Sequence, residues 1–362
     1  MDPGHRALPK SSIVPSAPPR PAKRAETDAP AIPLAQVALL GIGSQVPERR
    51  LTNADLSRMV DTSDEWIRTR TGIGERRILA PGQVTSDLAA DAARRALASS
   101  GLAPAQIDVV IVATATPDQS VPCTAAFVQE KIGARNAMGF DVDAGCTGFL
   151  YALQIGRSLI ASGAYANALV IGADALSLIT DYQSRETCVL FGDAAGAVVL
   201  GRSGGQARIT DMQLGLDGRG TSMIEVPGGG TVKPTSHETV EKREHYLRMN
   251  GREVFRFAVE KLSSLTRELC TRNHLTLEEI ELIIPHQANG RILDAAATAL
   301  ELDPARMFSN LEKYGNTSAA SIPLALDEAL QAGRIHKGDH VILAAFGAGL
   351  AWGGALLTFE KD

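Results

Sequence analysis

The sequence has few cysteines and lacks the spacings that would make them metal ligands. Its four cysteines are Cys123, Cys146, Cys188 and Cys270, and no CxxC pair or histidine-rich tract occurs among its 362 residues. Closely spaced Cys and His residues are typical of metal sites, so we expect no bound metal. We interpret the cysteines as free thiols and predict a reducing, cytoplasmic compartment.

A long apolar run and an excess of positive charge are also missing. No apolar stretch approaches the length of a membrane span, so no membrane partner is expected. The net charge is −5, which predicts no general attraction to nucleic acid or to anionic lipid. The chain does have 44% hydrophobic residues, enough for a large core or for two fused domains.

Residues 1–35 differ in composition from the rest of the chain. They hold 8 of the 18 prolines and five basic residues, Arg6, Lys10, Arg20, Lys23 and Arg24. They contain no continuous apolar segment, which excludes a secretory signal, and they lack the side chains for a packed core. We predict a disordered, proline-rich N-terminal tail and leave open a targeting or docking role.

The remaining sequence repeats itself. The stretch LAPAQIDVVIVATATP from Leu102 resembles LTLEEIELIIPHQAN from Leu275, at an offset of 275 − 102 = 173. Cys146 matches Asn316 at the similar offset of 316 − 146 = 170. Near-constant offsets indicate an internal duplication of one α/β unit.

The duplication divides the chain into an N-terminal half, 36–208, and a C-terminal half, 209–362. Apolar strands alternate with helices in both halves, for example the amphipathic helix predicted over 253–272. Buried strands with helices on either side predict a layered α/β architecture, in which two sheets share central helices.

Cys146 is the candidate nucleophile. It lies in a turn between a strand and an apolar helix, with Gly145 before it and Gly148 shortly after. Glycine permits unusual backbone angles and lets a ligand come close to the backbone. A thiol at a helix N-terminus lies in a partial positive field that favours the thiolate. The alternative for a lone cysteine is a small buried hydrophobe.

Two polar residues of the second half are its candidate partners. Of the seven histidines, His286 alone directly follows a buried apolar strand, and Asn316 lies in the turn KYGNTSAAS before a helix. Taken singly, they read as a core histidine and a helix cap. The duplication places Cys146 and Asn316 at equivalent turns, and pseudo-twofold symmetry would bring both near His286. The small-residue loop after Ala344 offers backbone N–H groups for an oxyanion hole, so the set predicts acyl transfer through a thioester.

These residues stand in motifs that resemble the β-ketoacyl-acyl carrier protein synthase III family of thiolase-fold condensing enzymes. The motifs are DTSDEWIRTRTGI, DAGCTGF, IIPHQAN, KYGNTSAAS and AFGAGLAWG, and the resemblance covers the chain from about residue 36 to its end. It implies a thiolase-like α/β fold with five layers, αβαβα, built from the two duplicated halves.

The resemblance also implies a reaction. Cys146 takes the acyl group of an acyl-CoA as a thioester, CoA leaves, and malonyl-ACP enters. His286 and Asn316 stabilise the enolate formed as CO₂ departs, and the backbone N–H groups of Cys146 and Ala348 form the oxyanion hole. The product is a β-ketoacyl-ACP that initiates fatty acid synthesis. Acyl-CoA and malonyl-ACP are substrates, so no metal or redox cofactor is expected.

Further residues are assigned only through the motifs. The family is homodimeric, and a position like Val121 shapes the acyl pocket, often that of the partner subunit. The resemblance places CoA against Trp66, Arg70 and Arg185, and the acidic carrier protein against Arg252, Arg256 and Arg291. Without it, the Trp and Arg residues read as a surface cation–π group and the other arginines as a solvated basic face.

Two departures from the family pattern bear on function. Ala348 stands where the middle glycine of three is usual, but its backbone N–H is retained. Val121 replaces a residue that is often aromatic, which predicts a longer or branched acyl group. The alternatives left open are a specialised-metabolism acyltransferase or polyketide-starter synthase with the same residues, and a catalytically silent module that binds acyl-CoA or carrier protein.

Overall fold

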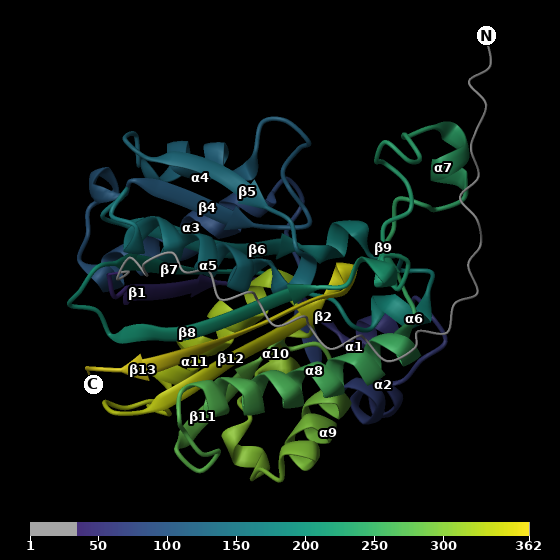
Figure 1. The fold of residues 1–362 in the computed structure, drawn as a ribbon. Coiled ribbons are helices and arrows are strands. Elements are labelled where there is room, and N and C mark those ends of the chain that lie inside the picture. The colour runs from purple at the N-terminus through teal and green to yellow at the C-terminus, as the bar shows by residue number, and fades with distance from the viewer. Residues whose placement is uncertain (1–34, 362) are drawn as a thin grey trace. The chain divides into compact units, whose positions relative to one another are not determined.

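Five strands of the N-terminal half form one part of the central sheet. The computed structural model describes residues 35–361 (Figure 1), so the predicted tail, apart from Ala35, lies outside the described residues. The strand β4 is a run of β-branched residues and alanine that is buried along its whole length, as expected for a strand covered on both faces. The five strands are β1 (Ala38–Gln45), β4 (Val109–Ala113), β5 (Met138–Val142), β6 (Ala168–Ala175) and β7 (Asp193–Gly201).

Four strands of the C-terminal half continue the sheet. They are β8 (Ala207–Leu216), β11 (Ile280–Pro285), β12 (His340–Gly347) and β13 (Ala351–Phe359). The complete order is β11-β12-β13-β8-β1-β7-β6-β4-β5. Instead of two separate sheets, the structure has one, because β1 pairs with β8 at Ala38–Arg208 and Leu39–Ala207. The predicted division at 208/209 falls inside β8, which belongs to the second half by its pairing with β13.

Strand order confirms the duplication. The first half runs β1-β7-β6-β4 and the second runs β8-β13-β12-β11, with the same sequence of antiparallel, antiparallel and parallel pairs. In the first half β5 adds a parallel strand beyond β4. In the second half that strand is reduced to one bridge between Ile283 and Met307. Each half is therefore the same unit, and the second has only a single bridge where the first has an edge strand.

The helices complete five layers, in agreement with the predicted fold class. The outer helices α3 (Thr85–Ser100) and α4 (Thr124–Ile132) cover the first half, and α8 (Gly251–Arg272) and α9 (Gly290–Leu300) cover the second (Figure 1). Between the halves lie α5 (Gly148–Ala161) and α11 (Ser321–Gln331), whose apolar side chains share one core cluster with strands of both halves. The helix that follows Cys146 is thus central, as its apolar sequence predicts.

The remaining elements are short and surround one end of these layers. Among residues 35–361, no helix has both the length and the apolar character needed to cross a membrane. The short elements are β2 (Arg50–Thr52), α1 (Asn53–Leu56), α2 (Asp64–Thr71), β3 (Glu75–Arg77), α6 (Arg185–Cys188), β9 (Ile224–Glu225), α7 (His237–Glu241), β10 (Arg248–Met249) and α10 (Leu311–Tyr314).

Candidate active site

Residues of both halves meet around a cavity of about 620 Å³. Seven residues singled out in the sequence line it, namely Trp66, Arg70, Cys146, His286, Arg291, Asn316 and Ala348. Four others do not: Val121, Arg185, Arg252 and Arg256. The structure therefore brings the candidate nucleophile together with both of its candidate partners, as the duplication predicts.

The turn that carries Cys146 is held against the C-terminal loop. Cys146 lies in a 3₁₀ turn, Gly145–Thr147, that leads directly into α5. A Cβ atom added to Gly347 would lie only 2.9 Å from the backbone nitrogen of Cys146, so no side chain fits there. Gly145 has a φ of 51°, and a Cβ atom on it would lie 3.3 Å from the nitrogen of Ala348. The N–H groups of Cys146 and Ala348 thus belong to facing segments, and their role as an oxyanion hole stays a prediction.

The environment of the Cys146 sulfur does not favour the thiolate. Burial raises the pKa of the thiol to about 12; the nearby carboxylates of Asp174 and Asp143 act in the same direction, and Ser318 acts in the opposite one. The position of Cys146 ahead of a helix was expected to lower the pKa of its thiol. With its pKa raised in this way, Cys146 is a protonated thiol at neutral pH and has to lose its proton during the reaction.

His286 follows β11 and is buried, with 1% of its surface exposed. Its Nδ1 atom lies 2.7 Å from Oγ of Ser321, the first residue of α11. Its ring meets the ring of Phe346 edge to face, with the ring centroids 5.4 Å apart. Burial lowers its pKa to about 3, so the imidazole is neutral at physiological pH. A neutral imidazole fixed at Nδ1 leaves Nε2 for a ligand in the cavity.

Asn316 is held by the segment that precedes β7. Its N–H donates to the carbonyl of Leu190 at 2.8 Å, and its carbonyl accepts from Gly192 at 2.9 Å. Its side-chain Oδ1 accepts the N–H of Ser318 at 2.9 Å. Since that oxygen is engaged, the Nδ2 amide group is the part of Asn316 that can donate to a ligand. The site therefore presents a neutral imidazole from His286 and an amide donor from Asn316.

Trp66 and two arginines form the outer part of the site. The guanidinium carbon of Arg185 lies 4.9 Å from the centre of the Trp66 indole, and that of Arg70 lies 6.0 Å from it. Arg185 also donates to the backbone carbonyl of Asp61 at 2.8 Å. This cluster offers a flat aromatic surface and two cations, which are groups that stack on a nucleobase and bind phosphate.

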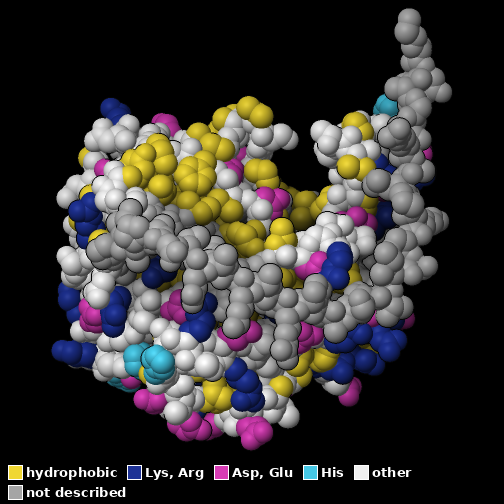
Figure 2. All heavy atoms as spheres, viewed as in Figure 1, with side chains coloured by type: hydrophobic (Ala, Val, Ile, Leu, Met, Phe, Trp, Pro, Cys, Tyr) yellow, Lys and Arg dark blue, Asp and Glu magenta, His cyan; other side chains and the backbone are white. Residues whose placement is uncertain are grey.

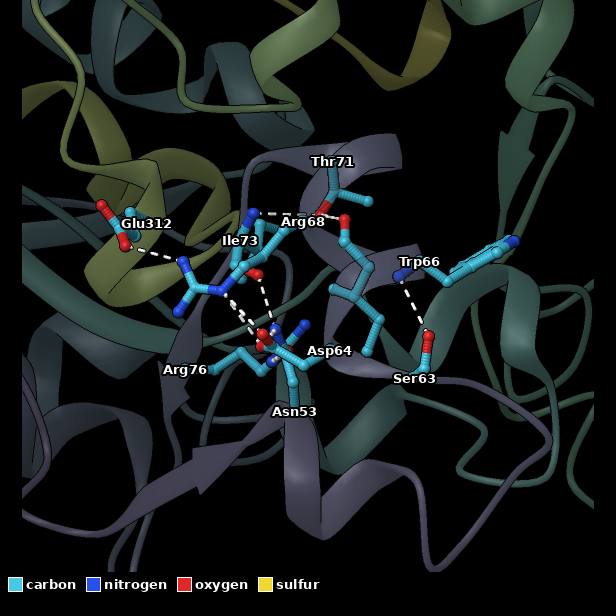
Figure 3. Close-up of polar contacts among 10 residues, drawn as sticks. Asn53, Ser63, Asp64, Trp66, Arg68, Thr71, Ile73, Arg76 and Glu312 are labelled. Atoms are coloured by element: carbon cyan, nitrogen blue, oxygen red, sulfur yellow. Dashed lines mark hydrogen bonds and ion pairs between the residues drawn. The ribbon is translucent and has the colours of Figure 1, made fainter.

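A polar network fixes the helix that carries Trp66 (Figure 3). Asn53 donates to Asp64 at 2.7 Å and to the carbonyl of Ile73 at 2.9 Å, and accepts from the buried Arg76 at 2.6 Å. Arg68 joins Asp64 to Glu312 in α10, shortly before Asn316. The network thus links the Trp66 helix to the second half beside the catalytic candidates.

Arg252, Arg256 and Arg291 are exposed, the first two on α8 and the third in the first turn of α9. Arg256 pairs with Glu253 one turn earlier on α8. Arg291 also lines the cavity, as do Gly251, Val254 and Phe255, which neighbour Arg252 and Arg256 on α8. Val121 is 82% exposed and lies outside the cavity of its own chain.

Sequence reasoning missed most of the apolar lining. One group lies between β6 and β7, and another comes from β9, β10 and the residue after β9. The apolar character of the first group was visible, but nothing in the sequence paired this loop with the Asn316 turn. These residues are Leu176, Ile179, Val189, Leu190, Phe191, Ile224, Val226 and Met249.

Two duplicated halves with a cysteine ahead of one central helix and an asparagine ahead of the other define a thiolase-like enzyme. Profiles for 3-oxoacyl-[acyl-carrier-protein] synthase III and for its C-terminal region match residues 140–218 and 270–359. The chain is 52% identical over 323 residues to β-ketoacyl-[acyl-carrier-protein] synthase III of Caldanaerobacter subterraneus subsp. tengcongensis, covering 89% of this chain and 98% of that protein.

Solved structures agree. The 3-oxoacyl-[acyl-carrier-protein] synthase III of Aquifex aeolicus VF5 has a TM-score of 0.82 at 43% identity, covering 89% of this chain and 100% of the other. The priming β-ketosynthase of the R1128 polyketide pathway has a TM-score of 0.82 at 34% identity, covering 91% and 98%. The chain belongs to the β-ketoacyl-[acyl-carrier-protein] synthase III family, as the sequence motifs predict.

Proposed function

We propose that the chain condenses an acyl-CoA starter with malonyl-ACP and so initiates fatty acid synthesis. The observation that carries this proposal is the meeting of Cys146, His286 and Asn316 in one cavity with Trp66 and Arg70. The 52% identity to a β-ketoacyl-[acyl-carrier-protein] synthase III supports it. No resident cofactor is invoked, because the CoA thioester and malonyl-ACP are substrates.

The first half-reaction loads Cys146. Its sulfur attacks the acyl carbonyl carbon, and the bond from that carbon to the CoA sulfur breaks. The acyl group replaces the proton on Cys146, and CoA leaves as the free thiol carrying one proton. The developing oxyanion is received by the backbone N–H groups of Cys146 and Ala348. Trp66, Arg70 and Arg185 hold the adenine and phosphate end of CoA, since together they supply an aromatic face and two cations.

The second half-reaction forms the carbon–carbon bond. Malonyl-ACP loses CO₂, and negative charge builds on its thioester oxygen. Neutral donors from His286 and Asn316 stabilise that charge more strongly than they stabilise the uncharged substrate, which lowers the barrier. The carbanion attacks the acyl thioester, and the released Cys146 sulfur regains one proton. Arg252, Arg256 and Arg291 receive the acidic carrier protein.

Intact mass spectrometry tests the loading step. After incubation with acetyl-, isobutyryl- or octanoyl-CoA, we expect the protein to gain the mass of the acyl group. The Cys146→Ala variant should gain nothing, whereas Cys270→Ala, which removes a buried cysteine outside the cavity, should behave as wild type. Malonyl-ACP should then discharge the adduct with release of CO₂ and formation of a β-ketoacyl-ACP.

The outcomes separate the alternatives. Absence of any adduct would favour a silent binding module. An adduct that malonyl-ACP does not discharge would favour an acyltransferase of specialised metabolism. Because Val121 is small, we expect the branched or the longer acyl group to load at least as fast as acetyl, and a strict preference for acetyl-CoA would contradict this.

The active form in this proposal is a homodimer in the cytoplasm. The four cysteines are unpaired, which suits a reducing compartment. Val121 is 82% exposed and Met138 on the edge strand β5 is 40% exposed. Figure 2 shows apolar side chains gathered over β5 and the loop that precedes α4. An apolar surface of this kind is typical of a protein–protein interface, and in a dimer Val121 would reach the partner's acyl pocket.

A further inference from the structure

Arg76, in the short strand β3, is a buried cation that the proposed mechanism does not use. Its side chain has no exposed surface. The guanidinium donates to Oδ1 of Asn53 at 2.6 Å (Figure 3) and, through its other terminal nitrogen, to the backbone carbonyl of Val189. Within residues 35–361 no Asp or Glu side chain bonds to it. Burying a cation without a carboxylate costs free energy, so an uncharged side chain of similar length would suit a purely structural position as well or better.

The stem of Arg76 packs on the two glycines that adjoin Asn316. A Cβ atom added to Gly192 would lie 3.2 Å from Cβ of Arg76, and one added to Gly315 would lie 3.2 Å from its Cγ. Gly315 precedes Asn316 in the chain, whereas Gly192 and Leu190 pair with Asn316 through backbone hydrogen bonds of 2.9 and 2.8 Å. The Arg76 side chain therefore touches both segments at the place where they pair.

The side-chain amide of Asn316 moves with its backbone. Its Oδ1 accepts the N–H of Ser318 within the same turn, so a shift of the turn carries the Nδ2 donor with it. Gly315 has a φ of 65°, and a Cβ atom on it would lie 2.6 Å from the carbonyl oxygen of Leu190. Only glycine permits so close an approach of the two segments, and Arg76 fills the space beside it.

The turn that carries Cys146 is supported elsewhere. Its contacts with Gly347 and Ala348 belong to the C-terminal loop. Within residues 35–361 no hydrogen bond of Arg76 reaches that loop or Cys146. A change at Arg76 is therefore expected to disturb Asn316 more than the nucleophile.

We propose that Arg76 is a positioning residue that holds Asn316 in place for the condensation step. The proposal rests on the proposed function, in which the Nδ2 amide of Asn316 donates to the thioester oxygen as the malonyl group loses CO₂. Without the guanidinium bond to Val189 the two paired segments can shift, and a displaced donor no longer fits the developing charge. Loading of Cys146 does not use this donor, so Arg76 acts in the second half-reaction.

The test separates the two half-reactions in Arg76→Met. Methionine is unbranched and apolar, and it has neither the donors nor the charge. Acylation of Cys146, followed by intact mass, should stay within about threefold of the wild-type rate. Transfer of the acyl group from the loaded enzyme to saturating malonyl-ACP, measured in a single turnover, should slow by about tenfold or more. Arg76→Lys, which keeps a donor and the charge, should recover part of that rate.

A double variant shows whether Arg76 acts through Asn316. Asn316→Ala removes the donor, so adding Arg76→Met to it should slow condensation no further than Asn316→Ala alone. Arg157→Met is the matched control, because Arg157 of α5 is also an arginine with a partly buried side chain but lies outside the cavity. This control should keep both wild-type rates.

A folded Arg76→Met variant that condenses at the wild-type rate would overturn the proposal. Equal losses in loading and condensation would also overturn it, as would losses that multiply in the double variant, because both indicate a general distortion. If Arg76→Met does not fold, Arg76→Lys carries the test. Its amine lacks the fork that reaches two acceptors, so condensation should still slow more than loading, and two unchanged rates would contradict the proposal. Failure of the proposed function looks different, since wild type itself would then form no acyl adduct or no condensation product.

Discussion

At the scale of single residues, the site combines groups whose burial sets their charge. His286 and Cys146 are both neutral at pH 7 because burial disfavours the imidazolium and the thiolate. Neutral donors suit the stabilisation of an enolate, which a cationic histidine would instead protonate readily. A consequence of this arrangement is that His286 destabilises the folded state at acidic pH.

We expect His286 to make the folded state sensitive to acid. Its pKa falls from an ordinary 6.5 to about 3 on folding, so below pH 6.5 the unfolded chain binds more protons and stability is lost as the pH falls. Between pH 7 and pH 5 this contributes a loss of about 2 kcal/mol. Asp174 acts in the opposite sense, because its pKa is raised in the folded state.

The measurement compares wild type with His286→Gln by denaturant unfolding at both pH values and equal protein concentration. Asp174 is present in both proteins, so its contribution cancels. The variant should lose about 2 kcal/mol less than wild type on going from pH 7 to pH 5. Equal losses in the two proteins would show that His286 is not held neutral by the fold.

At the scale of elements, the position of the Trp66 helix depends on a buried hub and an exposed ion pair. Asn53 is 1% exposed and bonds to Asp64, Ile73 and Arg76. Arg68 bridges Asp64 and Glu312, but its side chain is 46% exposed and that of Glu312 is 69% exposed. Removing the hydrogen-bond partner of a buried polar group lowers the free energy of unfolding substantially, whereas an exposed ion pair contributes little to it.

Asn53→Ala should therefore lower the free energy of unfolding by about 3 kcal/mol, because it leaves the Arg76 guanidinium and the Ile73 carbonyl short of partners. Arg68→Ala should lower it by less than about 1 kcal/mol. Chemical denaturation at one pH and protein concentration measures both. A larger loss in Arg68→Ala than in Asn53→Ala would mean that the exposed pair, rather than the hub, fixes α2.

Much of the element order was predictable, because each half repeats one pattern and Cys146 and Asn316 match at a near-constant offset. The protonation state of Cys146 could not be predicted. The local sequence shows only that the thiol precedes a helix, whereas its burial and the nearby carboxylate of Asp174 depend on the complete fold. The pairing of Leu190 with Asn316 could not be predicted either, because it joins segments that are more than one hundred residues apart and share no periodicity. Long-range contacts of this kind are set by packing.

At the scale of the whole molecule, association is expected to depend on the surface around β5. A charge placed there would have to be buried without a partner in a dimer. Val121→Asp should therefore weaken self-association at least tenfold, which sedimentation velocity over a range of concentrations would detect. Val232→Asp is the control, because Val232 is 79% exposed but lies in a different loop. Dissociation of both variants alike, or of neither, would contradict an interface at Val121.

The two ends of the sheet differ in how they are covered, which bears on the proposed homodimer. Beyond β11, Met307 forms a bridge to Ile283, and the N–H of Phe308 donates to the carbonyl of Ile283 at 2.9 Å. The β5 end has no such covering strand within residues 35–361. Two open ends would let copies add without limit into a filament, whereas one open end paired about a twofold axis closes on itself. In the proposed homodimer, with only the β5 end open, such pairing would therefore stop at two copies.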